Sequence, residues 1–492
     1  MNPDARTAPG ASRVARQVVA VWGVQLVLLF AQLGYTAIVS RRVDSVAFGQ
    51  YATALAVVAA VSMFANAGLS NAATRRDDES VAADRRTLTI GLLTGFATAM
   101  AVVVTVPIWT RIWNDPSSGS AIAIMAASLT LGPAGAILAG ALRRQGRIGS
   151  YNLVQLTASV LAMLVNLAVV LHYQSAWALA LLPVLTSVFV FAGGSVALGR
   201  RALPTTQLSG VRQDVQFGVK SMSLWAVAVV GNFAPVWALG RFCGSAVLGQ
   251  WNRAQVVGRL PFETGVRGLL TVIFPKLRGA RRHDVDTSRT WSSMVAVSAL
   301  LVLPIGFAVL PATPAAIRVL LGAQWTVAAQ MVPYVAVGGI GLVLNLIVAN
   351  ALEASAFFRL EGLANAGWLA VNFMGVVATA ISGSWLGVAV AIAIAPVVAN
   401  TTQLWLCARN GLIFPKVVAA WYAVALGCAT IAGGVSWLLI QSVATPVAQL
   451  SAAMAVVFVT GGLLLLGSRR HRPVRRLLEL LKGEDAAPEP AH

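Results

Sequence analysis

Residues 250–275 read QWNRAQVVGRLPFETGVRGLLTVIFP and lie where a regular series of apolar segments requires another membrane span. Unlike its neighbours, this stretch carries Arg253, Arg259, Glu263 and Arg267. At about 100° per residue, these four side chains fall within an arc of roughly 120° on one helix. Charged groups inside a bilayer almost always face a bundle interior or a wet cavity. The stretch therefore predicts one wall of a polar, net-positive chamber.

The composition places the chain among polytopic membrane proteins. Hydrophobic residues make up 58% and charged residues only 11%, with a mean hydropathy of +0.76, whereas soluble domains carry about 25% charged residues. We expect an all-α fold with about 14 transmembrane helices, since each apolar segment can cross a hydrocarbon core of ~30 Å. The segments span residues 17–39, 50–70, 87–108, 120–141, 151–172, 176–198, 218–239, 250–274, 290–312, 328–350, 361–382, 386–408, 417–438 and 446–467.

Basic residues predict the orientation of these spans. Of the 36 Lys and Arg residues, 28 fall in one set of connections and termini, five in the alternate set, and three in the eighth span. Because cytoplasmic loops carry the excess of Lys and Arg, both termini are predicted to be cytoplasmic. The net charge of +19 is then a property of topology, and no nucleic-acid partner is indicated.

An internal repeat at an offset of 200 residues suggests two lobes. Six positions recur, namely Arg41, Ser45, Gly49, Gln50, Ala54 and Val57 as Arg241, Ser245, Gly249, Gln250, Ala254 and Val257. Six spans separate the copies, so the halves are predicted to be parallel, as in some transporters. We expect a cytoplasmic segment (1–16), an N-lobe (17–198), a cytoplasmic loop (199–217), a C-lobe (218–408), two further helices (409–467) and a basic cytoplasmic tail (468–492).

Three motifs carry a family resemblance. They are IVSRRVDSVAFGQYATAL in the first hairpin, RFCGSAVLGQWNRAQVVGRLPFETGVRGLLTVIFPKL around the eighth span, and IRVLLGAQWTVAA before the tenth. The chain resembles the polysaccharide-transporter family, the Wzx-type oligosaccharide flippases of the multidrug/oligosaccharidyl-lipid/polysaccharide exporter superfamily. The resemblance implies two six-helix lobes around a central cavity, two extra C-terminal helices, and movement of a polyprenyl-diphosphate-linked oligosaccharide across a bacterial cytoplasmic membrane for cell-surface polysaccharide synthesis.

The charged stretch fits such a substrate. Arginine pairs in a bidentate way with phosphate oxygens and stays protonated. Arg259 and Arg267 flank Glu263 at i−4 and i+4, so the carboxylate can offset their charge until a diphosphate displaces it. Pro261 removes a helical hydrogen bond between them and predicts a bend. We therefore expect Arg253, Arg259, Glu263 and Arg267 to bind substrate during alternating access.

Roles that involve no substrate also stay open for the charged residues. Arg253 and Arg267 could snorkel to the interfaces, and Arg259 with Glu263 could form a structural ion pair. Polar residues within spans, such as Tyr35 and Asn345, more often bond neighbouring helices than line a sugar path. The mixed-charge loop that includes Asp84 is expected to be solvated. Five tryptophans near predicted outer helix ends are expected to form an interface belt, namely Trp109, Trp113, Trp251, Trp325 and Trp385.

Three other functions have to be compared with the sequence. A peptidoglycan lipid-precursor flippase would carry a similar diphosphate lipid. A drug antiporter for cations needs intramembrane carboxylates, and Glu263 is the one acidic residue well inside a predicted span. An enzyme is not expected, because no large extramembrane loop or carboxylate constellation is present.

No cofactor, metal site or disulfide framework is indicated. The expected partners are membrane lipids and, through the resemblance, a polysaccharide polymerase and glycosyltransferases, with the chain a monomer.

Overall fold

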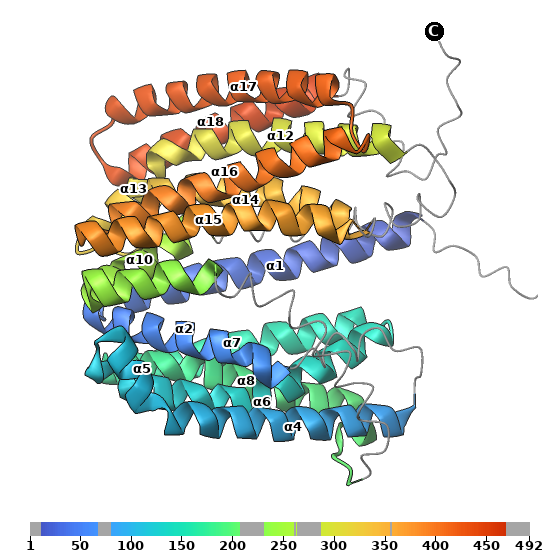
Figure 1. Cartoon of the computed structure of the whole chain (residues 1–492), viewed down its shortest axis with the longest axis vertical. Coiled ribbons are helices and arrows are strands. Elements are labelled where there is room, and N and C mark those ends of the chain that lie inside the picture. The colour runs from blue at the N-terminus through green and yellow to red at the C-terminus, as the bar shows by residue number, and fades with distance from the viewer. Residues whose placement is uncertain are drawn as a thin grey trace, which may run out of the picture. The chain divides into compact units, whose positions relative to one another are not determined.

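The computed structural model describes residues 11–66, 80–206, 231–259, 262, 287–354 and 357–468, and every regular element in these ranges is helical (Figure 1). The longer helices are α1 (Ala11–Ser40), α2 (Ser45–Asn66), α4 (Val81–Val104), α5 (Val106–Trp113), α6 (Gly119–Arg144), α7 (Ile148–Tyr173), α8 (Ala176–Leu198), α10 (Ser245–Gly258), α12 (Thr287–Val309), α13 (Thr313–Leu320), α14 (Thr326–Ala354), α15 (Phe358–Ser382), α16 (Leu386–Arg409), α17 (Pro415–Gln441) and α18 (Pro446–Ser468).

The predicted all-α membrane fold is confirmed. Within the described ranges, 12 helical stretches are long and apolar enough to cross a membrane, and they coincide with predicted spans one to six and nine to fourteen. The seventh and eighth predicted spans, 218–239 and 250–274, lie largely outside the described residues. The number of fourteen therefore stays a prediction.

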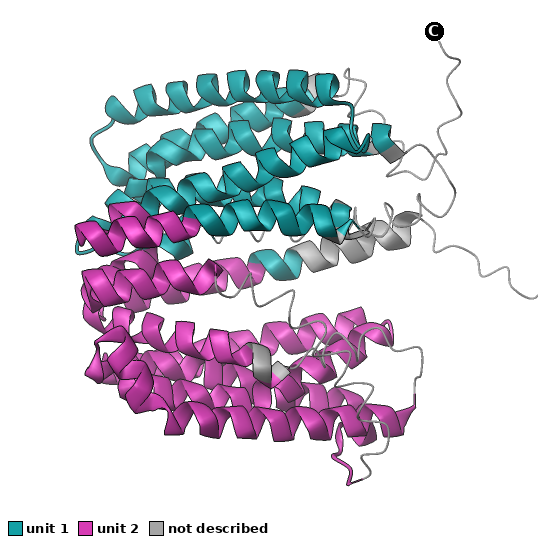
Figure 2. Ribbon diagram, in the orientation of Figure 1, with its two compact units in different colours: residues 1–26, 254–371, 389–492 teal, residues 27–253, 372–388 magenta. Residues whose placement is uncertain are grey.

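The chain divides into two compact units (Figure 2). Unit 2 consists of residues 27–253 and 372–388, and unit 1 consists of residues 1–26, 254–371 and 389–492. The dividing point after Arg253 falls inside α10. The first part of α10 thus belongs to the same compact unit as α2 to α8, and the predicted lobe boundaries at 198 and 218 stay a prediction.

Small residues let the helices of unit 2 approach closely. A Cβ atom on Gly95 of α4 would lie 2.5 Å from the carbonyl oxygen of Leu129 on α6. Close backbone approach through small residues is the usual basis of helix packing in membranes. Further along the same pair of helices, Leu88 of α4 and Leu138 and Leu142 of α6 form a buried cluster with Leu198 of α8.

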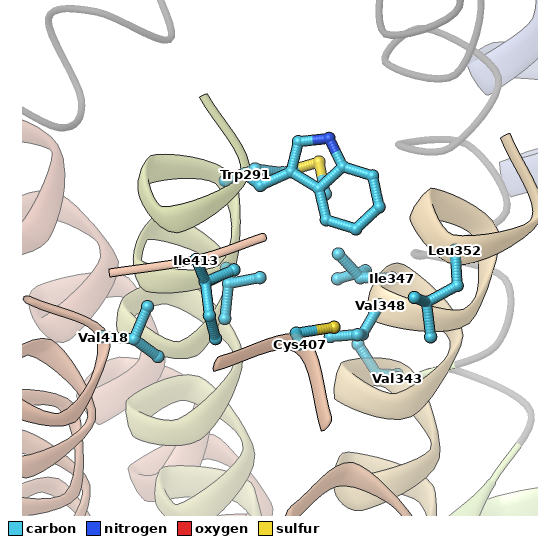
Figure 3. Close-up of a cluster of buried hydrophobic side chains, with 10 residues drawn as sticks. Trp291, Val343, Ile347, Val348, Leu352, Cys407, Ile413 and Val418 are labelled. Carbon is cyan, nitrogen blue, oxygen red and sulfur yellow. The ribbon is translucent and has the colours of Figure 1, made fainter. Parts of the chain in front are cut away.

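Unit 1 has its own apolar core (Figure 3). Trp291 of α12, Ile347 of α14, Cys407 of α16 and Val418 of α17 are all buried in one cluster. Four helices of unit 1 are thereby held together by side-chain packing, which drives helix association in a bilayer in place of the hydrophobic effect.

The expectation that Asp84 is solvated is wrong. Asp84 lies in the first turn of α4, only 6% exposed, and binds Arg144 at 2.6 Å and Arg201 at 3.2 Å. Arg85 donates to the carbonyl oxygens of Leu203 and Pro204. The carboxylate therefore joins α4, α6 and the start of the predicted inter-lobe loop, where Arg201 lies.

The tryptophan-belt expectation is also wrong for three of the five residues. Trp113, Trp251 and Trp325 are each 1% exposed. Trp113 packs on Phe233 in an edge-to-face contact, with ring centroids 5.6 Å apart. A predicted position near a helix end does not separate a lipid-facing indole from one that fills space between helices.

Candidate functional site

The first turns of α2 and α10 meet at repeat-related glycines in unit 2. A Cβ atom on Gly49 would overlap the carbonyl oxygen of Ser245, and one on Gly249 would overlap the carbonyl oxygen of Ser45. Each glycine thus faces the first residue of the other helix. The two hairpins identified by the sequence repeat make a reciprocal contact, and the glycines allow the backbones to touch.

Asp115 connects this crossing to the loop between α5 and α6. Its Oδ2 accepts a hydrogen bond from Ser245 Oγ at 2.6 Å, and its Oδ1 accepts one from Ser117 Oγ at 2.7 Å. Gln50 Nε2 donates to Ser117 Oγ at 3.0 Å. Asp115 is 9% exposed. Sequence reasoning missed this residue because it lies in a loop, with no periodicity to mark its burial.

Arg253 lies two turns into α10 and is buried beneath α1 and α2. Its side chain is 6% exposed, its guanidinium carbon lies 4.1 Å from the centroid of the Phe48 ring, and Nη1 is 3.5 Å from Ser40 Oγ. Nη2 donates to Asn252 Oδ1. A snorkelling arginine would place its guanidinium at the surface, whereas this guanidinium is enclosed by two other helices.

The part of the chain that the structure describes places no carboxylate beside the charge of Arg253. Within the described residues, no carboxylate lies at salt-bridge distance from Arg253, and its Nε has no hydrogen-bond partner. A buried charge without a partner is costly, and the face of Phe48 offsets only part of that cost. The site can therefore stabilise an anion that presents oxygen acceptors to Nε.

The other predicted substrate ligands are less fully described. Arg259 directly follows the last residue of α10, is half-buried, and makes an interaction with other residues. Glu263, Arg267 and the bend predicted at Pro261 lie outside the described residues. The predicted arc of four charges therefore stays a prediction beyond Arg253 and Arg259.

Tyr35 behaves as the interhelical interpretation predicts. Its hydroxyl donates to Asn166 Oδ1 of α7, and Asn166 Nδ2 donates to the carbonyl oxygen of Ala178 at 2.8 Å. The three groups link α1, α7 and α8, so Tyr35 has a structural partner inside unit 2.

Unit 1 contains an apolar cavity of about 610 Å³ between α12, α17 and α18. Its walls include Leu300, Trp421, Ile431, Val456 and Leu463. Such a volume is in the range of small-ligand sites, and its lining suits a hydrocarbon chain.

Among the described residues, no cluster of three His, Cys, Asp or Glu residues could hold a metal ion.

Comparison with known families decides the relationship. A family model described as "Polysaccharide biosynthesis protein" matches residues 38–330, more than half of the chain. The chain belongs to this family. The matched region of this chain contains the first hairpin, the start of α10 and the Gly322–Trp325 motif. The predicted family resemblance is therefore confirmed.

Solved structures show the same fold. A structure described as a lipid II flippase MurJ in an inward closed conformation matches with a TM-score of 0.71 at 11% identity, covering 92% of this chain and 100% of that one. An inward-facing multidrug resistance MATE family transporter of the MOP superfamily matches with a TM-score of 0.50 at 14% identity, covering 79% and 98%. No curated protein matches this chain. At such identities the similarity establishes the membrane-transporter fold alone.

Proposed function

We propose that this protein is a flippase that moves a polyprenyl-diphosphate-linked oligosaccharide across the bacterial cytoplasmic membrane for cell-surface polysaccharide synthesis. It works by alternating access with both termini in the cytoplasm. Family membership and the transporter fold support this proposal, as they favour transport over enzymatic chemistry. A polymerase and glycosyltransferases are the proposed partners, because a flipped oligosaccharide must be made before transport and joined to a polymer after it.

The observation that carries the proposal is the buried guanidinium of Arg253, which has no carboxylate at salt-bridge distance among the described residues. A diphosphate group can supply the oxygen acceptors that this guanidinium lacks, in the charge-assisted geometry that arginine favours. A cationic drug would instead be repelled by Arg253, which argues against a cation exporter on this fold.

The other charged residues of the predicted chamber have proposed roles around the same headgroup. Arg259 and Arg267 add cationic contacts to the diphosphate, and Glu263 offsets their charge in the empty state. Neutralising fixed cations in this way lowers the cost of an empty cavity without removing its preference for anions.

The apolar cavity supports a lipid-linked cargo. A polyprenyl chain is hydrocarbon throughout, and the cavity between α17 and α18 is lined almost wholly by apolar side chains. Part of the lipid chain can lie there while its headgroup crosses, so the cost of moving the hydrocarbon into water is avoided.

Reconstituted transport tests this function and separates it from the alternatives. Proteoliposomes containing the wild-type protein would be loaded with one of three fluorescent cargoes: a polyprenyl-diphosphate oligosaccharide, a peptidoglycan lipid precursor, or an organic cation. We expect protein-dependent movement of the oligosaccharide lipid. Movement of the precursor alone would assign the protein to peptidoglycan synthesis, and movement of the cation alone would overturn the proposal.

A further inference from the structure

The contacts around Asp115 suggest how access to Arg253 is controlled. Asp115 is a buried carboxylate whose two oxygens accept hydrogen bonds from serine hydroxyls, Ser117 in its own loop and Ser245 at the start of α10. Within the described residues, no cation lies at salt-bridge distance from it. A hydroxyl–carboxylate bond is strong for a hydrogen bond, yet it can be exchanged for water when the contact opens.

The crossing of α2 and α10 beside Asp115 can open without side-chain rearrangement at its two glycines. At Gly49 and Gly249 the backbones of α2 and α10 touch without interposed side chains. No knob of one helix is inserted into a hole of the other at these two positions, so parting them requires no side-chain rearrangement there. At these two positions the helices are in backbone contact without interlocking side chains. Directional bonds across the crossing come instead from the hydrogen-bond network of Gln50, Ser117, Asp115 and Ser245.

The loop that joins α15 and α16 reaches the same part of unit 2. Cys243, two residues before Ser245, lies with its Sγ 3.5 Å from the carbonyl oxygen of Gly383. The connections α1–α2, α5–α6, the one before α10 and α15–α16 are all assigned to the outer side by the predicted topology. Residues of all four belong to unit 2, as expected if the start of α10 is held against the other helices at this end of the unit.

We propose that the Ser245–Asp115 hydrogen bond is a reversible outer clasp that holds the start of α10 against α2 and encloses Arg253. When the clasp opens, α10 leaves Gly49, and the guanidinium of Arg253, now packed against Ser40 and Phe48, becomes accessible from the outer side. The clasp concerns access alone and goes beyond the proposed function, because it operates whichever anion the arginine binds.

Thiol labelling tests the clasp without any transport assay. Ser40, which is fully buried beside Arg253, is changed to cysteine in a background in which Cys243, Cys407 and Cys428 are alanine. The protein is reconstituted in vesicles and labelled from either side with a membrane-impermeant maleimide. Asp115→Ala and Ser245→Ala are the test variants, and Asp115→Asn keeps part of the hydrogen bonding.

A matched control comes from a second outer-loop carboxylate. Asp44 accepts a bond from the backbone N–H of Ala47 within its own hairpin, so Asp44→Ala removes a carboxylate that does not join α2 to α10. If Asp115→Ala fails to fold, Ser245→Ala, which deletes one hydroxyl group, carries the test.

We expect both Asp115→Ala and Ser245→Ala to raise labelling from the outer side about tenfold, the size of effect that one hydrogen bond to a charged acceptor has on an equilibrium. Asp115→Asn should fall between these variants and the parent, and Asp44→Ala should match the parent. Unchanged labelling in both test variants overturns the clasp. Equal increases in the test variants and in Asp44→Ala also overturn it, because they show general loosening. If the wild-type protein moves no polyprenyl-diphosphate oligosaccharide while the labelling results are as expected, the cargo proposal alone is contradicted.

Discussion

Gly49 and Gly249, which are 200 positions apart in the sequence, each lie against the carbonyl oxygen of the residue that begins the other's helix. This reciprocal contact is the local symmetry expected where two copies of a repeated hairpin face one another. Glycine is needed at both positions, since any side chain would enter the opposite backbone.

Replacing Gly49 with alanine is expected to destabilise the protein. The new Cβ would meet the backbone of Ser245, which cannot move aside as a flexible side chain can, so the cost should reach or exceed the ~1–3 kcal/mol typical of overpacking. Thermal unfolding in detergent measures this, with Gly34→Ala as the control, because a Cβ at Gly34 meets nothing within 4 Å. Equal midpoints for the two variants would contradict the crossing.

Asp84→Ala should cost more than Arg201→Ala. Asp84 binds Arg144, itself 7% exposed, at 2.6 Å, and breaking a buried ion pair by removing one partner costs about 3–5 kcal/mol. Arg201 is 27% exposed, so water can replace its partner. The measurement is again the unfolding midpoint, and a larger loss from Arg201→Ala would show that the ion-pair cluster is organised differently.

Gln403→Leu is expected to stabilise unit 1. Gln403 of α16 is fully buried, and neither atom of its amide has a hydrogen-bond partner in the described part of the chain. An unsatisfied buried polar group costs about 1–3 kcal/mol, and leucine has a similar size without that cost. Gln330→Leu, at an exposed position on α14, is the control. A fall in the midpoint for Gln403→Leu would instead indicate that a bound molecule satisfies the amide.

Filling the apolar cavity should slow the transport of lipid-linked cargo. Ala455 lines the cavity, so Ala455→Trp would occupy space proposed for the polyprenyl chain while leaving Arg253 untouched. Leu466→Trp, on an exposed part of α18, adds the same indole elsewhere. We expect flipping to fall severalfold in the first variant alone, and unchanged flipping there would exclude the cavity as a lipid site.

The sequence predicts the membrane fold well because apolar segments of fixed minimum length are a direct consequence of bilayer thickness. It also identifies the hairpins that contain Gly49 and Gly249. Burial within the membrane region is harder to predict, because lipid and protein interiors accept the same apolar side chains. Trp251 and Trp325 therefore look like interface residues in the sequence, yet they lie inside the protein.

The candidate site was predictable only in part. Arg253 stands out in the sequence as a charge in an apolar segment, and its enclosure by Ser40 and Phe48 needs the structure. Asp115 and Asp84 gave no signal, since both lie beside loops where carboxylates are usually solvated. Their partners come from other helices that no local pattern connects to them.

The proposed function depends on the contact between Arg253 and the diphosphate of the cargo. The most direct measurement is the affinity of purified protein for a polyprenyl diphosphate, compared between wild type, Arg253→Gln, Arg253→Lys and the exposed control Arg318→Gln. A buried charge-assisted contact predicts a loss of about tenfold to a hundredfold for Arg253→Gln, a smaller loss for Arg253→Lys, and none for Arg318→Gln. Affinity equal to wild type in well-folded Arg253→Gln would show that Arg253 does not bind the diphosphate.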